Sequence, residues 1–549
     1  MSFLNCIVLS VLSSVVFAFA LPNEVLNFGS SVLGFLALIP LYAVFSKAKN
    51  RKTIAVCFGI WVALVHLMGS FWLGFFKDYA IFTLGASSVA YFVLASAFAP
   101  AFYEALHLKN KNLRPLFFAI VLVFWEWFKS NGFLGYPWGT LEMTAFNAHW
   151  LKQIADITGV WGISFVIAFT SASFAQVILS ITEELAKGKL SKDCVISQLR
   201  VLACVCFLCF VSGLYSFVSF KKPLKQVDSL KVAIVQPNSN SWEPDYEKKI
   251  KELIDLTESL LVNSENPDLI IWNEGSLPCA YPLSLVYYFT TPENYTFVDF
   301  MLKNETPLLA GTAMPVAGSE NSNGVPQFFT NSVCLISPEA EVLDTYAKAQ
   351  LVPFAEYMPF IEKPFVQKFF KSLVGFSSGY LPGKNLNLIS LRKKDGGVIN
   401  FSAPICFEDA FPSLCASLHN LGSELMINLT DDSWSRTDSA EYQHFIVASF
   451  RTIELRTTLI RSANAGYSCV IDPKGEVTSD LPLFTSAGLY ADVPIYEYTT
   501  TFYTRFKDWL PIICYLLTLA LPIWKFLSCK FKLKKSKEIV LLECENCCD

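Results

Sequence analysis

Three polar residues in the second half of the chain, a glutamate, a lysine and a cysteine, each follow an apolar run. Glu274 ends the run Leu-Ile-Ile-Trp-Asn-Glu, Lys348 follows Tyr-Ala, and Cys406 follows Pro-Ile. A carboxylate, an ammonium and a thiol at strand ends can converge at one edge of an α/β sheet, where sites of this fold class form. A thiol with a pKa of about 8.5 needs a base at neutral pH, and an ammonium can stabilise an oxyanion. Taken singly, the three residues also fit a surface acid, a turn lysine and a buried apolar cysteine.

Other kinds of chemistry find little support in the sequence. A Ser-His-Asp triad needs a histidine, and the polar middle of the chain offers only His419 and His444, neither of them in a recognisable motif. The sequence has no His-Glu-x-x-His and no P-loop. A Cys-x-x-Cys at Cys544 and Cys547 is weak evidence for a metal site, because no second pair accompanies it. The net charge of −4 gives no reason to expect nucleic-acid binding. We therefore expect no metal and no cofactor.

The composition predicts a membrane protein. Of the 549 residues, 53% are hydrophobic and only 16% are charged, whereas soluble proteins are about 25% charged. A helix needs about 20 apolar residues to cross the hydrocarbon core. The fourth such run contains Pro100, which can bend it, and the fifth contains Glu126 and Lys129, charges that are either functional or paired with each other. The eight predicted spans are 3–21, 26–45, 54–76, 80–106, 115–132, 159–181, 200–220 and 507–528.

Basic residues in the connections predict the orientation of these spans. Lysine and arginine recur in alternate connections, at 47–52, 109–114 and 187–200, and in the tail at 525–537. Because cytoplasmic loops are enriched in these residues, both termini are expected to be cytoplasmic. The sequence therefore predicts a membrane domain at 1–227, a catalytic domain at 228–497 on the opposite side, and an eighth span with a cytoplasmic tail at 498–549. Ala18-Phe19-Ala20 also fits a signal-peptidase site, although no basic residue precedes the run.

The segment between the seventh and eighth spans alternates between strand and helix patterns. Continuous apolar runs, which are typical of strands in sheets covered on both faces, occur at 230–236, 269–272, 398–405 and 425–429. Residues 245–263 carry apolar positions at helical spacing. This pattern predicts an α/β domain.

In this context, Glu, Lys and Cys in this order, with Cys-Phe-Glu at a strand end, resemble the nitrilase superfamily. The chain is most similar to the membrane branch of that superfamily, the apolipoprotein N-acyltransferase family. The similarity includes Gly135-Tyr136-Pro137-Trp138, the run at 351–359 and the residues at 451–466. It implies an αββα sandwich beside a polytopic helical membrane domain.

Two single positions and one loop depart from the family pattern. Phe407 stands where the family usually has tyrosine, and Ala355 where it usually has glycine. The family's Asn-Asp-x-Trp-Phe is here Asp-Asp-Ser-Trp-Ser, at 431–435. These changes leave open what the loop at 431–435 contacts.

The resemblance implies transfer of a fatty acyl chain from a membrane phospholipid to the N-terminal amine of a diacylglyceryl-modified apolipoprotein. It also implies a monomer in the bacterial inner membrane, with its catalytic domain on the periplasmic side. A membrane-anchored amidase or nitrilase is the main alternative, with water in place of the amine. A transporter with an extracytoplasmic binding domain is a third, although its spans should carry more charges.

The resemblance assigns roles to individual residues. Cys406 is the expected nucleophile, Glu274 the base, and Lys348 the partner of the oxyanion together with the backbone N–H of Phe407. Glu356 and Glu408 are expected to support them, or else to form ordinary structural salt bridges. Expected substrate contacts are Trp138, Trp242, Asn331, Tyr357 and Trp434. A lid over the site is expected from the loops that carry Trp138, Trp150, Tyr357, Met358 and Phe360.

Overall fold

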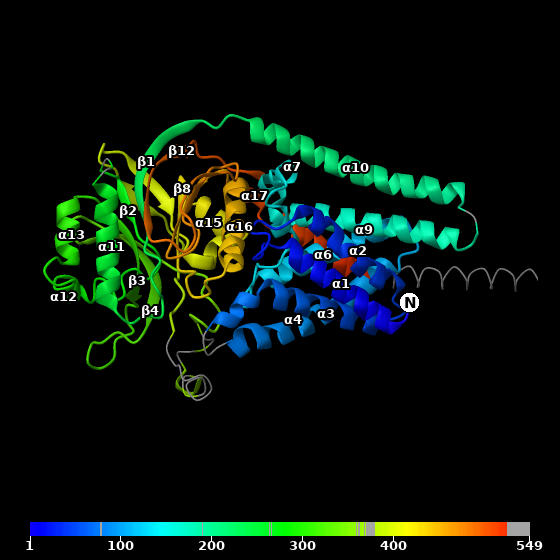
Figure 1. Ribbon diagram of the computed structural model, residues 1–549, viewed down its shortest axis with the longest axis horizontal. Helices are drawn as coiled ribbons and strands as arrows, with labels where there is room; N and C mark the ends of the chain where they lie inside the picture. The colour runs from blue at the N-terminus through cyan, green and yellow to red at the C-terminus, as the bar shows by residue number, and fades with distance from the viewer. Residues whose placement is uncertain are drawn as a thin grey trace, which may run out of the picture.

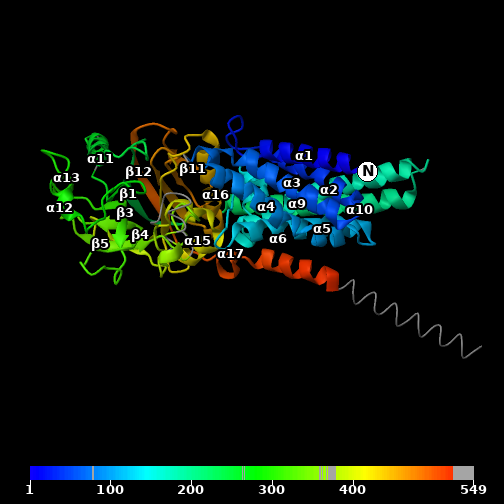
Figure 2. The same ribbon diagram turned by 90° about the horizontal axis from the view of Figure 1, so that it is seen from below.

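The protein has two regions that lie end to end. The computed structural model describes residues 1–523 apart from 77–79, 189, 263, 265, 358, 359, 361, 362, 367 and 369–378. Long helices form a bundle at one end, and strands with their covering helices lie at the other (Figure 1). A view at right angles shows the same separation, with the N-terminus at the far end of the bundle (Figure 2).

The helical region is built from the apolar runs of the sequence. Its principal helices are α1 (Phe3–Ala20), α2 (Ser31–Lys47), α3 (Arg51–Gly69), α4 (Ser87–Ser96), α5 (Ala99–Leu106), α6 (Arg114–Ser130), α9 (Val160–Leu185) and α10 (Lys192–Lys221). Shorter helical segments connect them: η1 (Phe71–Phe75), η3 (Ile81–Ala86), η4 (Lys111–Leu113), η5 (Leu141–Ala145), α7 (His149–Lys152) and α8 (Ala155–Thr158). After the α/β region come α17 (Phe502–Phe506) and a last apolar helix at Trp509–Ile523.

Seven of the predicted runs, and the described part of the eighth, fall largely on helices, which confirms an apolar multi-helix region. Within the described residues, four helices, α1, α3, α9 and α10, are long and apolar enough to cross a membrane. The number is five if Thr83–Ser96 and Ala99–Leu106, bent by 41°, are counted as one span. Pro100 lies in the first turn of α5, beside this bend, where its missing N–H is tolerated. The count of eight spans stays a prediction.

Two six-stranded sheets form the core of the α/β region. In the first, the strand order is β12 (Ala487–Tyr496), β1 (Gln226–Gln236), β2 (Leu269–Ile271), β3 (Leu308–Pro315), β4 (Phe329–Ile336) and β5 (Val342–Ala347). In the second, it is β11 (Val477–Asp480), β10 (Cys469–Ile471), β9 (Thr458–Ala463), β8 (Leu425–Thr430), β7 (Val398–Ser402) and β6 (Ile389–Arg392). The central strands β1, β2 and β3, and likewise β7, β8 and β9, are parallel.

Alternation along the strands explains why the sheets stack. In β1, Val232 and Ile234 pack into the core between the two sheets, whereas Ala233 and Val235 pack against the outer helices. The first sheet is covered by α11 (Tyr246–Leu261) and α13 (Phe297–Asn304), with the short α12 (Leu285–Tyr288) beside them. The second is covered by α15 (Pro412–His419) and α16 (Asp438–Leu455). The predicted αββα sandwich is confirmed.

Buried polar contacts join the sandwich to the helical region. Gln443 on α16 accepts a hydrogen bond from the indole of Trp72 at 3.1 Å and donates to the carbonyl of Pro22 at 2.8 Å. Arg456 forms an ion pair with Asp156 at 2.6 Å. Because such contacts are directional, they fix how the sandwich sits on the helices.

Candidate active site

Lys348 lies between two glutamates at one edge of the first sheet. Its side chain is fully buried, and its Nζ lies 3.3 Å from Oε1 of Glu274 and 2.8 Å from Oε1 of Glu356. Strands β2 and β5 end just before Glu274 and Lys348. These two strands run in the same direction, because β2 is parallel to β3 and two antiparallel steps lead from β3 to β5. The sheet therefore brings these two residues together, as the spacing of the sequence predicts.

Asn331 on β4 connects the two carboxylates. Its Nδ2 donates to Oε1 of Glu274 at 2.7 Å and to Oε1 of Glu356 at 2.9 Å. Its backbone carbonyl accepts from the N–H of Lys348 at 2.8 Å. The second oxygen of Glu274 accepts the backbone N–H of Asp431 at 3.1 Å. Both Asn331 and the 431–435 loop thus orient Glu274, and for Asn331 this contact differs from the substrate contact expected from the sequence.

Cys406 comes from the second sheet, four residues after β7, and begins the short helix η6 (Cys406–Ala410). Its φ of +50° is in the left-handed region, which a non-glycine residue adopts at a cost that is often found at functional sites. Asn428 on β8 donates to its carbonyl at 2.9 Å. The backbone at the thiol is therefore held in an unusual conformation by its neighbours.

Burial and charge set the pKa values of the three groups. Burial raises the pKa of the Cys406 thiol well above its ordinary value, and the charge of Glu274 raises it further while Lys348 opposes the rise. Burial also raises the pKa of Glu274, against the pull of Lys348. For Lys348, burial disfavours the charged form, but the carboxylates of Glu274 and Glu356 outweigh it and raise its pKa well above the usual range. The site thus combines a thiol that needs a base, a carboxyl with an increased proton affinity and a permanent cation.

Glu408, two residues after Cys406, binds mainly backbone N–H groups, and it also accepts a hydrogen bond from the hydroxyl of Tyr346 at 3.2 Å. Its carboxylate accepts the N–H groups of Ala349 at 2.7 Å, Gln350 at 2.9 Å and Ile405 at 2.8 Å. It therefore ties the segment after Lys348 to the residue before Cys406. Of the two supporting acids expected from the sequence, Glu356 contacts the lysine directly and Glu408 fixes the spacing of the two chain segments.

The helical region reaches the site through Trp138. This ring is 5% exposed and stacks on Phe407 with 6.4 Å between ring centroids. The Nζ of Lys348 lies over the ring of Phe407, 5.6 Å from the ring centroid. Phe407 stands between the lysine and the helical region, so its ring still packs although the hydroxyl of the family's usual tyrosine is missing.

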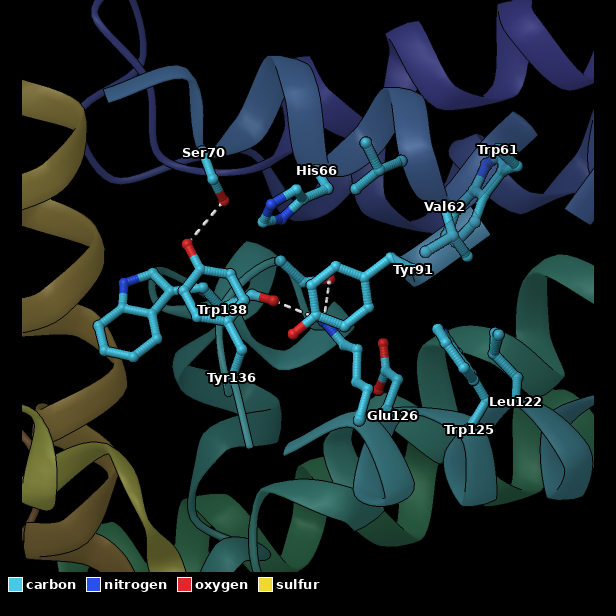
Figure 3. A pocket seen from close by; sticks show the side chains of 13 residues that line it. Trp61, Val62, His66, Ser70, Tyr91, Leu122, Trp125, Glu126, Tyr136 and Trp138 are labelled. Atoms are coloured by element: carbon cyan, nitrogen blue, oxygen red, sulfur yellow. Dashed lines mark hydrogen bonds between the residues drawn. The ribbon is translucent and has the colours of Figure 1, made fainter. Parts of the chain in front are cut away.

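A small pocket inside the helical bundle, with aromatic, aliphatic and a few polar side chains, lies beside the loop that carries Trp138 (Figure 3). Lys129 donates to the carbonyls of Trp138 and Gly139, and Tyr136 donates to Ser70 at 2.8 Å. Oε1 of Glu126 accepts the N–H of Leu141 at 2.8 Å. The free volume of about 20 Å³ is room for about one water molecule. Glu126 and Lys129 both bind the backbone of this loop, so they act on its shape.

The other aromatic residues expected at the site pack against aromatic rings of the helical region. Trp434 packs on Trp72 and Phe76 with centroid distances of 5.6 and 5.4 Å, and Trp242 packs on Phe76 at 5.6 Å. Tyr357 contacts Phe133 at 6.0 Å. These contacts create an aromatic boundary between the site and the bundle.

The remaining residues of the expected lid have different positions. The ring of Trp150 stacks on Phe35 of α2 at 6.1 Å, within the helical region. Phe360 is 65% exposed, and Met358 lies outside the described residues. The lid itself therefore stays a prediction.

A buried charge network behind Cys406 was not recognised from the sequence. His444 contacts Asp409 and Asp432, each at 2.9 Å, and Arg461 pairs with Asp409. Burial lowers the pKa of His444, but Asp432 and Asp409 outweigh this and raise it to about 9. The ring of Trp138 lies 5.7 Å from that of His444. The acidic residue Asp409, directly after Glu408, was the one local hint of this network in the sequence. Its partners His444 and Arg461 lie 35 and 52 residues further along the chain, so local patterns could not identify them.

The described cysteines and acids form neither a disulfide nor a cluster of metal-ligand type. Every described cysteine is free. Among the described residues, no group of three or more histidine, cysteine, aspartate or glutamate side chains is placed to hold a metal ion. Cys544 and Cys547 lie outside the described residues.

Comparisons with known proteins agree with these observations. A family model described as the apolipoprotein N-acyltransferase N-terminal domain matches residues 13–173, and one described as carbon-nitrogen hydrolase matches residues 231–501. Apolipoprotein N-acyltransferase 2 of Treponema denticola is 44% identical over 92% of this chain and 95% of its own length. Its namesake in Treponema pallidum is 41% identical over 94% of each chain. An amidase from Nesterenkonia sp. aligns with 50% of this chain and 93% of its own at 16% identity, with a TM-score of 0.34. The chain belongs to the apolipoprotein N-acyltransferase family.

Proposed function

We propose that this protein transfers a fatty acyl chain from a membrane phospholipid to the N-terminal amine of a diacylglyceryl-modified apolipoprotein, through a thioester on Cys406. One observation carries the proposal beyond family membership. The residue next to the thiol, Phe407, packs on Trp138 of the apolar helical region. A site at the junction with the helices suits a substrate that stays in the bilayer. Moving a long acyl chain into water would cost on the order of 10 kcal/mol, at about 0.8 kcal/mol per CH₂.

The first half-reaction forms the thioester. Glu274 takes the proton of the Cys406 thiol, and the thiolate attacks the ester carbonyl of the phospholipid. Lys348 stabilises the tetrahedral oxyanion together with the backbone N–H of Phe407. On collapse the C–O bond breaks, and Glu274 returns the proton to the leaving alkoxide of the lysophospholipid. The raised pKa of Glu274 supports both transfers.

The second half-reaction discharges the thioester. The neutral amine of the acceptor attacks the thioester carbonyl and passes a proton to Glu274. The C–S bond then breaks, and the thiolate of Cys406 recovers the proton. Because each half-reaction moves a proton through one carboxyl, Glu274→Gln is expected to block both.

The setting of the enzyme is part of the same proposal. The bias of basic residues supports eight spans, a periplasmic catalytic domain and a cytoplasmic tail in a bacterial inner membrane. We propose that the enzyme acts as a monomer, as the family resemblance implies. The expected substrate contacts at Trp242, Tyr357 and Trp434 lie at the aromatic boundary described above.

Incubation of the purified protein with phospholipid tests the proposal. Mass spectrometry should find one acyl group on Cys406, and a peptide that begins with diacylglyceryl-cysteine should discharge it to the N-acyl product. Cys406→Ala should abolish both signals, whereas Cys279→Ala, at a half-buried thiol of the same domain, should retain them. Rapid turnover of the thioester to free fatty acid that the peptide does not divert would instead identify a membrane-anchored hydrolase.

A further inference from the structure

An open groove of about 550 Å³ lies on the α/β region outside the cluster of Glu274, Lys348 and Cys406. The 237–240 loop and α11 form its walls, with Arg436 and Ser486 at its borders. Ten of its twelve lining residues are polar or charged. This composition differs from the aromatic boundary near Trp434, so the groove is unsuited to an acyl chain.

Hydrogen bonds connect the wall of this groove to the candidate base. The backbone N–H of Ser239, in the groove wall, donates to Oδ1 of Asn464 at 2.9 Å. The Nδ2 of Asn464 donates to Asp431 at 3.1 Å, and the N–H of Asp431 donates to Glu274 at 3.1 Å. The loop that lines the groove is therefore connected to Glu274 through Asn464 and Asp431.

The groove leads away from the helical region. Next to the lining residue Glu243, the ring of Trp242 contacts Phe76 of the helical region with 5.6 Å between ring centroids, so this end of the groove is the one nearer the bundle. The other wall is α11, which lies in the layer of the sandwich farthest from the helical bundle in both views (Figures 1 and 2). A ligand that fills the groove would thus extend from the site outward, away from the apolar helices.

The dimensions and chemistry of the groove fit an extended polypeptide. Its residues on α11 run from Lys248 to Ser259, which at 1.5 Å per residue is about 16 Å. An extended chain of about five residues covers that length at about 3.3 Å per residue. Serine and asparagine side chains can hydrogen-bond to peptide groups regardless of sequence. Glu243, Glu252 and Asp255 outnumber Lys248 and Arg436, so the groove carries a slight negative charge.

We infer that this groove binds the acceptor polypeptide, namely the first few residues that follow its acylated N-terminal cysteine. The inference rests on the proposed function, because it needs the acceptor amine at Glu274. The lipid chains of the acceptor then remain at the aromatic boundary, while its polypeptide leaves along α11. This arrangement allows acceptors of differing sequence, since the groove offers hydrogen bonds rather than fitted pockets.

The test compares a short and a long acceptor on groove-blocking variants. Ser259→Trp places a large ring on the α11 wall and Ser486→Trp places one at the border of the groove, both at exposed positions, and Val262→Trp, at the exposed C-cap of α11 outside the groove lining, is the matched control. For a diacylglyceryl peptide of eight residues, both blocking variants should raise KM about 5- to 10-fold with kcat unchanged. For diacylglyceryl-cysteine amide, which cannot reach the groove, KM should match that of wild type.

Thioester formation from phospholipid should be unchanged in all three variants, which checks that each is folded. An equal KM for the long acceptor in Ser259→Trp, Ser486→Trp and Val262→Trp would overturn the groove assignment and leave the transferase intact. Failure of wild type to acylate either acceptor would overturn the proposed function itself. As a second measurement, a photoreactive residue at position four of the long acceptor should crosslink to residues 237–259, and crosslinking confined to other segments would refute the path along α11.

Discussion

Two lysines in this protein each interact with two glutamates, one in the α/β region and one in the helical region. Lys348 contacts Glu274 and Glu356 directly, at 3.3 and 2.8 Å. Lys129 interacts electrostatically with Glu126 and Glu142, but its hydrogen bonds go to backbone carbonyls. The same three charges are thus used in two different ways.

The hydrogen-bond partners account for the difference. In the α/β region, Asn331 and Lys348 donate to carboxylates, and the charges of Glu274 and Lys348 act on the Cys406 thiol. In the helical region, Lys129 and Glu126 bind the backbone at 138–141, Glu142 accepts from the hydroxyls of Thr140 and Ser164, and the free space beside Lys129 and Glu126 has room for about one water. The first arrangement can change protonation during a reaction, and the second holds a loop in place.

The largest expected effect is that of Lys348→Met. The oxyanion loses its charged partner, so acyl transfer should fall by roughly 10²–10³-fold, by analogy with the loss of an oxyanion donor. The measurement is the rate of thioester formation on Cys406 in detergent at saturating phospholipid. The control is the thermal stability of the variant, which should stay close to that of wild type. Glu274 and Glu356 are 11% and 16% exposed, so water can solvate their charges when the lysine is removed. A decrease in rate of less than tenfold would mean that the lysine does not act on the reacting carbonyl.

For Lys129→Met the expected effect is on stability. The variant leaves Glu126 and Glu142 buried without their cation, a change that typically costs about 3–5 kcal/mol. Denaturation in detergent should therefore occur at a clearly lower temperature than in wild type. Addition of Glu142→Gln should recover part of this loss because it removes one buried carboxylate. If Lys129→Met were as stable as wild type but lost the first half-reaction entirely, the helical cluster would have a chemical role that its contacts do not suggest.

A smaller effect is expected for Trp138→Leu, which removes the ring that connects the two regions. Phe407 loses its stacking partner, so the backbone N–H beside Cys406 becomes less well positioned. We expect the rate of thioester formation to fall about 3- to 10-fold, on the scale of the 0.5–1.5 kcal/mol of an aromatic pair. Trp138→Phe should retain most of the rate, because a ring can still stack there. Trp150→Leu, whose ring packs on Phe35, is the matched control and should not change it.

Local patterns were sufficient for some of these features and not for others. The apolar run at β2 and the residue after β5 correctly placed Glu274 beside Lys348, because strand direction follows from the order of elements. The partners of Lys129 and Asn331 could not be predicted in the same way. Lys129 binds carbonyls of a loop that folds back on its own helix, and Asn331 bridges residues 57 positions before and 25 positions after it. Such contacts depend on tertiary packing and leave no periodic signal.

The smallest expected effect is on the pH dependence of the first half-reaction. Glu274 must be ionised to accept the thiol proton, so the rate should decline as pH falls through its pKa. Since burial raises that pKa, the decline should occur above about 4.3, the ordinary value for glutamate. The charge of Glu356 adds to the rise, so Glu356→Gln should move the decline to lower pH. Glu142→Gln, the corresponding change in the helical cluster, should leave the position of the decline unchanged. If the decline moved to lower pH by the same amount in Glu356→Gln and Glu142→Gln, it would report the stability of the fold. The difference between the glutamates around Lys348 and those around Lys129 would then not concern the chemistry.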